Sequence, residues 1–130
     1  RKLSVLKPNS AGTDADWTGG FAELSDADIT SGASSDATGE RVSSNIEAYT
    51  GSTTGSIETV VPLGLGLATG AGPQNIAHYL KIGGTNYDGA AQAQAASPAF
   101  FSESHTTNPA TGLNWEYADL AGLQIGLVSS

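Results

Sequence analysis

Two histidines, thirteen acids and many serines are the residues of this chain that could carry chemistry. A nucleophilic site needs a His next to a Ser and an acid, but the sequence contains no Gly-x-Ser-x-Gly elbow. His78 falls on the apolar face of an alternating segment, which favours a hydrogen-bonded core histidine. His105 follows a segment end and precedes a turn, which favours a surface position. Neither His has a partner at metal-ligand spacing.

The segment 14–19, Asp-Ala-Asp-Trp-Thr-Gly, is the best metal candidate. It partly matches the start of a calcium loop, with ligand oxygens at Asp14, Asp16 and Thr18 and then a glycine. The twelfth position is Ser25 instead of Glu, and no flanking helices are evident. A solvated acidic loop anchored by Trp17 is therefore the interpretation we favour, and we expect no metal and no cofactor.

Other catalytic arrangements fit no better. A glycosidase would need a pair of acids flanking a sugar, but the acids here lie in polar segments without a Trp- or Tyr-lined cluster around a pair. The run 64–70, Gly-Leu-Gly-Leu-Ala-Thr-Gly, only superficially resembles a dinucleotide fingerprint, because its spacing is wrong and no helix follows. We expect no catalytic residues and no enzyme activity.

Charge and composition restrict the classes of partner that this chain could bind. The net charge is −8 with five Lys and Arg, so no basic cluster could neutralise several phosphates of a nucleic acid or dock on an anionic membrane. No apolar run approaches the roughly 20 residues of a membrane helix. The absence of Cys excludes disulfides and mildly favours assembly in a reducing cytoplasm. Because the chain also lacks Met, we expect it to begin after a processed or disordered N-terminus.

Short alternating segments between Gly, Pro and Asn must position these residues. We predict strands at 2–7, 21–24, 41–49, 56–69, 75–82 with a continuation over 85–87, 98–104 and 123–127. Between them we expect turns at 8–10 and 51–55, a polar loop at 11–20, an exposed connection at 25–39 and a loop or loosely helical crossing at 89–96. This pattern predicts an all-β protein, with residues 1–130 as a single jelly-roll-like β-sandwich of about seven or eight short antiparallel strands.

The segment 56–69 combines two unlike faces. Val61, Leu63, Leu65 and Leu67 share one face, and the opposite face is smooth because it carries glycines. Pro62 and the glycines would cost a helix several kcal/mol, at about 3 for Pro and 1 for each Gly, so a strand is favoured. The smooth face invites close approach of another backbone or subunit.

The C-terminal stretch 108–127 closes the domain. Pro109 fixes φ and Gly112 permits a positive φ, so the turn between them has little freedom. Trp115 then plugs one end of the sandwich. Asn114 is the expected N-cap of a short helical turn that reaches about Ala121. The closing strand turns three apolar side chains inward: Leu123, Ile125 and Leu127.

Several features together resemble a known family. The first is Leu6-Lys7-Pro8-Asn9, followed by Trp17, and the second is Ser56-Ile57-Glu58-Thr59-Val60, which leads into a strand. The third is Asn108-Pro109-Ala110-Thr111-Gly112-Leu113-Asn114-Trp115. An acidic helical turn and then Leu123-Gln124-Ile125-Gly126-Leu127 follow this third feature. This arrangement is similar to β-sandwich domains of tailed-phage virion proteins. The resemblance implies a non-enzymatic virion protein, assembled in the host cytoplasm. It would be a capsid decoration (cement) or head-fibre protein that binds the major capsid protein or other virion proteins as a homo-oligomer.

Two alternatives remain open from the residues. A subunit of an extracellular filament could be joined by strand exchange, and it would need a free first strand, so that residues 1–7 sit in a neighbour. A glycan-binding module would need two or more exposed aromatic residues on one face.

Overall fold

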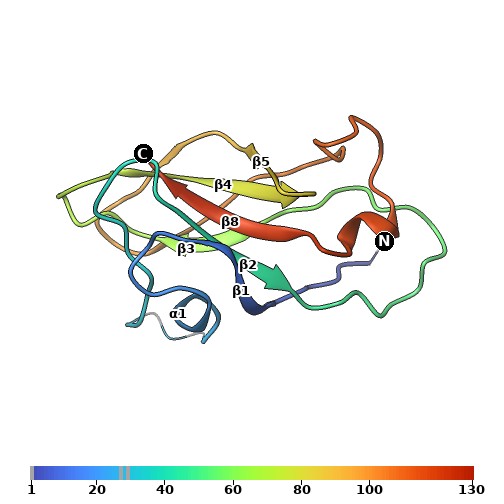
Figure 1. Ribbon diagram of the computed structural model, residues 1–130, viewed down its shortest axis with the longest axis horizontal. Helices are drawn as coiled ribbons and strands as arrows, with labels where there is room; N and C mark the ends of the chain where they lie inside the picture. The colour runs from blue at the N-terminus through green and yellow to red at the C-terminus, as the bar shows by residue number, and fades with distance from the viewer. Residues whose placement is uncertain (1, 27, 29) are drawn as a thin grey trace.

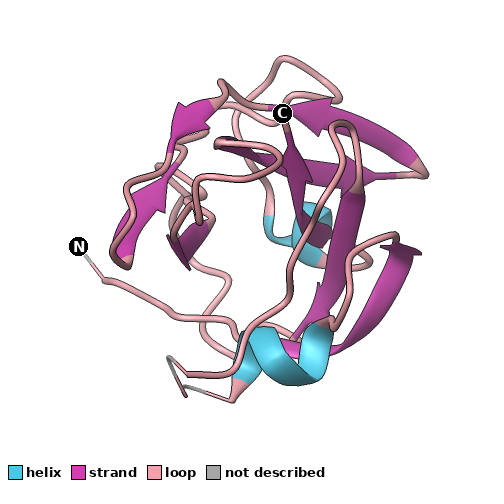
Figure 2. Ribbon diagram, turned by 90° about the vertical axis from the view of Figure 1, so that its left-hand side faces the viewer, coloured by secondary structure: helices cyan, strands magenta, loops and turns pink. Residues whose placement is uncertain are grey.

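The computed structural model describes residues 2–26, 28 and 30–130 and shows an all-β sandwich of two antiparallel sheets (Figure 1). The larger sheet has the order β1 (Pro8–Ala15), β2 (Arg41–Ile46), β8 (Gln124–Ser129), β4 (Asn75–Ile82) and β5 (Thr85–Asp88), with β6 (Gln92–Ala93) also paired to β4. The smaller sheet contains β3 (Leu63–Gly66) and β7 (Ala99–Ser102). Figure 2 shows strands on opposite sides of the domain. The expected all-β class is confirmed.

The start of the chain differs from the prediction. Residues 2–7, the leading segment, form no strand, and β1 instead occupies the positions predicted as a turn and a polar loop. Side chains from β2 and β8 stabilise β1, because Asp14 N–H donates to Ser43 Oγ of β2 and Thr13 N–H donates to Gln124 Oε1 of β8, both at 3.0 Å. These bonds accompany its irregular register against β2. Arg1 lies outside the described residues.

The strand predicted at 21–24 is wrong, because the chain forms the short helix α1 (Phe21–Ser25) there. Gly20 N–H donates to Glu23 Oε2 at 2.7 Å, and Leu24 N–H donates to the Gly20 carbonyl at 3.0 Å. These two bonds close a helical turn locally. The exposed connection predicted at 25–39 follows, and its positions 27 and 29 lie outside the described residues.

For two further segments, the structure agrees only in part with the predicted secondary structure. Of the strand predicted over 56–69, only β3 is regular, because its single strand partner β7 is four residues long. The segment 89–96 was expected as a loop or loose helix, but its residues 92 and 93 form β6. Backbone pairing of Asn75 and Ile76 with these two residues outweighs the helix propensity of the alanines.

The apolar core lies at the end of the sandwich where the 3-10 helix η1 (Tyr117–Leu120) is found. Trp115 packs with Leu80 and Leu123, and its Nε1 donates to the His105 carbonyl at 2.9 Å. Partly buried apolar residues surround this cluster: Ile46, Ile57, Val60, Ile82, Leu120 and Ile125.

The C-terminal turn and strand have the following places. Gly112 has a φ of 72°, in the left-handed region, and Pro109 is half-buried. Asn114 is not the N-cap of η1, because the helix begins two residues later than expected, after Glu116, whose N–H donates to Asp119 Oδ2 at 2.8 Å. The closing strand β8 lies at the centre of the larger sheet, between β2 and β4.

Candidate functional site: an apolar groove between the sheets

Register divides the side chains of the larger sheet between two faces. Val42 pairs with Leu127 and Ser44 pairs with Ile125, so these four side chains share the inner face. The outer face carries the alternate residues, among them Tyr79, which pairs with Gly126. The two faces have opposite chemistry, polar outside and apolar inside.

The outer face holds a polar cluster centred on Tyr79, which is 0% exposed. Its hydroxyl donates to Asp14 Oδ2 at 2.6 Å, and Lys81 Nζ lies 3.1 Å and 3.2 Å from the two oxygens of the same carboxylate. The Arg41 guanidinium lies over the Tyr79 ring, 4.7 Å from its centroid. Arg41 also donates two hydrogen bonds to Asp88, at 2.8 Å and 2.7 Å. The cluster therefore joins β1, β2, β4 and β5.

The cluster shifts the pKa values of its members. Burial opposes ionisation of Asp14, but the hydrogen bonds from Tyr79 and Lys81 together hold the pKa of Asp14 below its usual value. The hydrogen bonds from Arg41 lower the pKa of Asp88. Burial, with Asp14 as hydrogen-bond acceptor, raises the pKa of the Tyr79 hydroxyl. Asp14 therefore stays ionised and Tyr79 stays protonated at neutral pH, which is the state that the observed contacts require.

The residues proposed as calcium ligands serve separate contacts. Asp14 belongs to the Tyr79 cluster, Asp16 Oδ2 accepts a hydrogen bond from Arg41 N–H at 3.0 Å, and Thr18 forms a backbone bridge with Ser34. Within residues 2–26, 28 and 30–130, no group of three or more His, Asp or Glu side chains is placed to hold a metal ion.

The histidines lie near β7. His78 is buried and hydrogen-bonded as predicted: its Nε2 lies 3.1 Å from the Phe101 carbonyl, and its ring stacks on Phe101 at a centroid distance of 4.4 Å. Burial lowers the pKa of His78, so the ring is neutral at pH 7. His105 is half-buried instead of lying at the surface, because its backbone bridges to Val60.

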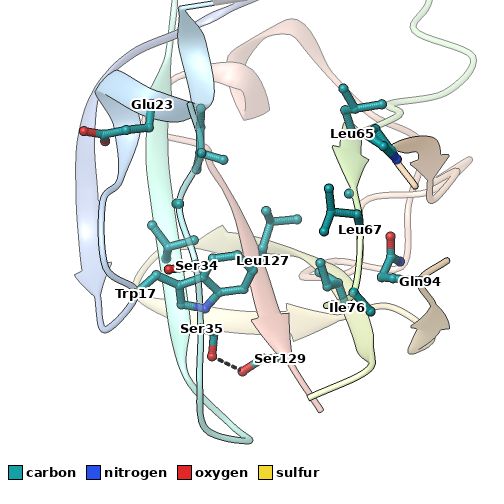
Figure 3. Close-up of a pocket in the computed structure, with 18 of the residues that line it drawn as sticks. Trp17, Glu23, Ser34, Ser35, Leu65, Leu67, Ile76, Gln94, Leu127 and Ser129 are labelled. Atoms are coloured by element: carbon teal, nitrogen blue, oxygen red, sulfur yellow. Dashed lines mark hydrogen bonds between the residues drawn. The ribbon is translucent and has the colours of Figure 1, made fainter. Parts of the chain in front are cut away.

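The inner face opens into an apolar groove of about 750 Å³, away from the Trp115 core. Its floor includes Val42 and Leu127 from the larger sheet, and one wall is β3 with the following Leu67 (Figure 3). Figure 3 shows Leu67 and Leu127 facing one another across the opening. Leu65 and Leu67 remain 40% and 41% exposed. The groove thus has apolar walls that the chain itself leaves partly in solvent.

Polar groups lie at the margins of the groove. Ser35 Oγ donates to Ser129 Oγ at 2.9 Å, the contact drawn in Figure 3. Trp17 closes the same end, with its Nε1 donating to the Glu40 carbonyl at 3.0 Å. Asp26 and Asp28 line the side next to α1 and are exposed. One side of the groove is therefore acidic.

The wall at β3 carries an unpaired strand edge. β3 lines the groove along its whole length, from Leu63 to Gly66. One edge of β3 pairs with β7. Among the residues that the structure describes, no strand pairs with its other edge. This edge leaves backbone N–H and C=O groups available to an added strand.

The sequence predicts the two unlike faces of β3, with the smooth face open to close approach. In the structure the smooth face packs inward: a Cβ on Gly64 would lie 3.1 Å from Phe101 and 3.2 Å from His78. This close approach turns the leucines towards the groove and solvent. The sequence signal for this exposed leucine wall is a segment with leucines on one face and glycines on the other.

No protein-family model, curated protein sequence or solved structure matches this chain. Within the described residues, no helix is long and apolar enough to cross a membrane.

Proposed function

We propose that this protein is a non-enzymatic structural subunit that self-associates through the apolar groove, as a capsid decoration or head-fibre protein of a phage virion. The single observation that carries the assembly role is the partly exposed leucine wall of the groove, where Leu65 and Leu67 are 40% and 41% exposed. Covering these apolar side chains with a partner would remove them from water, which is favourable. The virion setting rests on the resemblance of the C-terminal motif, which also makes the major capsid protein the expected second partner.

Surface area supports the assembly role. A folded monomer of this mass typically exposes about 6,400 Å², and this chain exposes 7562 Å². The excess of about 1,200 Å² is comparable to one partner's share of a stable protein interface, which is about 800 Å². Covering the groove in an assembly would bring the exposed area closer to that of a compact subunit.

The test compares two leucine substitutions in sedimentation equilibrium across a wide range of protein concentration. Leu65→Asp places a charge in the groove and is expected to weaken self-association at least tenfold. Leu113→Asp is the matched control, since Leu113 is 69% exposed and lies outside the groove. A monomer at every concentration, or equal association of both variants, would contradict the proposal. Immunogold labelling of native particles then tests the location: labelled icosahedral heads are expected, and labelled filaments would contradict the virion assignment.

A further inference from the structure

The leading segment offers apolar side chains that its own chain leaves uncovered. Leu3 is 88% exposed and Val5 is 70% exposed, the highest and third highest values among the large hydrophobic residues that the structure describes. Both side chains fall on one face of an extended segment, because they are two residues apart. Two side chains on one face are what a strand needs in order to fill a groove beside a sheet edge.

The segment is held outside its own groove. Glu47 N–H donates to the Lys7 carbonyl at 2.8 Å, and Lys7 N–H donates to Glu47 Oε2 at 3.0 Å. These bonds fix the chain where it enters β1, and residues 2–6 then extend away from that strand (Figures 1 and 2). The apolar side chains and the groove are therefore complementary in chemistry but separated in space.

Charge points to the same pairing. Three of the five basic residues of this acidic chain lie within its first seven positions, at 1, 2 and 7. The other two, Arg41 and Lys81, are ion-paired on the outer face. The side of the groove next to α1 is acidic, with Asp26 and Asp28. A basic segment with two apolar side chains thus matches an apolar groove with an acidic margin.

Length also fits. Six extended residues span about 20 Å, and the four residues of β3 span about 13 Å. The leading segment can therefore cover the whole free edge of β3 with residues to spare.

We infer that the leading segment of one copy adds as a third strand to the free edge of β3 in a second copy. Leu3 and Val5 then enter the groove above Val42 and Leu127, and backbone hydrogen bonds satisfy the open edge of β3. A contact of this head-to-tail type closes into a ring or continues as a filament. This inference rests on the proposed self-association and names the segment that produces it.

The first test replaces the two apolar side chains of the segment together, as Leu3→Ser with Val5→Ser. Both residues are exposed in the single chain, so the thermal melt at low concentration is expected to stay unchanged. Self-association in sedimentation equilibrium is expected to weaken at least tenfold, while Leu113→Ser, the matched control, associates normally. Equal association of the double variant and the control would overturn strand addition.

The second test uses the absence of cysteine from the natural sequence. A Val5→Cys chain is mixed with a Leu65→Cys chain in a glutathione buffer, and intermolecular disulfides are measured on a non-reducing gel. The mixed dimer is expected in at least tenfold greater yield than from Val5→Cys with Leu113→Cys. Equal yields would overturn the inference. A disulfide that forms only within a chain carrying both cysteines would also do so, by placing the segment in its own groove.

The two tests separate this inference from the proposed function. If Leu65→Asp abolishes self-association but the Leu3→Ser/Val5→Ser variant retains it, the groove is still the assembly surface and strand addition is wrong. If neither variant changes the association, both proposals are wrong. Weakening by both variants, together with the cysteine crosslink, supports both.

Discussion

Substitution of Gly126 by Ala is expected to disrupt the outer face of the larger sheet. A Cβ at this position would lie 2.2 Å from Tyr79 Cζ and 2.4 Å from Cε1, far inside contact distance. The ring has no free space, because Tyr79 is fully buried under the Arg41 guanidinium and is hydrogen-bonded to Asp14. The added methyl must therefore displace a ring held from two sides.

The expected cost has two parts. Overpacking of a filled site costs about 1–3 kcal/mol, and loss of a hydrogen bond to a charged group costs about 1.5–3 kcal/mol. Gly126→Ala should therefore lower the free energy of unfolding by about 3–5 kcal/mol, measured in urea at pH 7. For a chain of this length that loss corresponds to a fall in Tm of about 10–20 °C.

Two variants check the cause of this loss. Gly32→Ala is the matched control, since a Cβ there has no atom within 4 Å and the backbone is not left-handed, so its stability should change little. Adding Tyr79→Ala to Gly126→Ala should cost less than the sum of the two single changes, because the clash disappears with the ring. Additive costs, or a loss below about 1 kcal/mol for Gly126→Ala alone, would refute the argument.

Three further outcomes are expected. Trp115→Ala should destabilise by about 3–5 kcal/mol in denaturant melts, since it opens the core and leaves the His105 carbonyl without its indole donor; a loss under about 1 kcal/mol would show that the ring is not a plug. Because the folded pKa of Asp14 is lowered, its contribution to stability is present above its unfolded pKa of about 4 and is lost as pH falls through the folded value. Unfolding measured between pH 7 and pH 2 should accordingly show a smaller acid destabilisation in Asp14→Asn than in the unchanged protein. Chelation with EDTA should leave Tm unchanged, whereas a clear fall would assign calcium to the loop of Asp14, Asp16 and Thr18.

The sequence predicts most reliably where local and long-range preferences agree. The strand at 75–82 is found with the predicted bounds. Its alternation ends at Gly83-Gly84, and both β5 and β8 pair with it in regular antiparallel register. The first strand was misplaced because β1 is polar and is stabilised by Ser43 and Gln124 side chains. Because β1 lacks alternating apolar residues, no sequence pattern marks it as a strand. Leu3 and Val5 in the leading segment alternate as strand residues do, although that segment forms no strand.

The groove could not be predicted from local pattern. The groove exists because one edge of β3 pairs with β7 and the glycine face of β3 packs on Phe101. Both of these contacts join residues that are distant in sequence. The leucine alternation was visible in the sequence, but an alternating strand normally buries its apolar face. Here glycine allows the opposite face to pack more closely.

The contrast between the two faces of the larger sheet favours the groove over the outer face as the proposed contact surface. On the outer face, the Tyr79 cluster pairs its charges within the chain, so its shifted pKa values have a structural cause and require no substrate. On the inner face, the groove leaves a strand edge and leucines open, while the segment best suited to them lies elsewhere on the same chain. If the leading segment of a second copy fills the groove as proposed, both sets of exposed apolar side chains become buried, which is the physical reason to propose assembly.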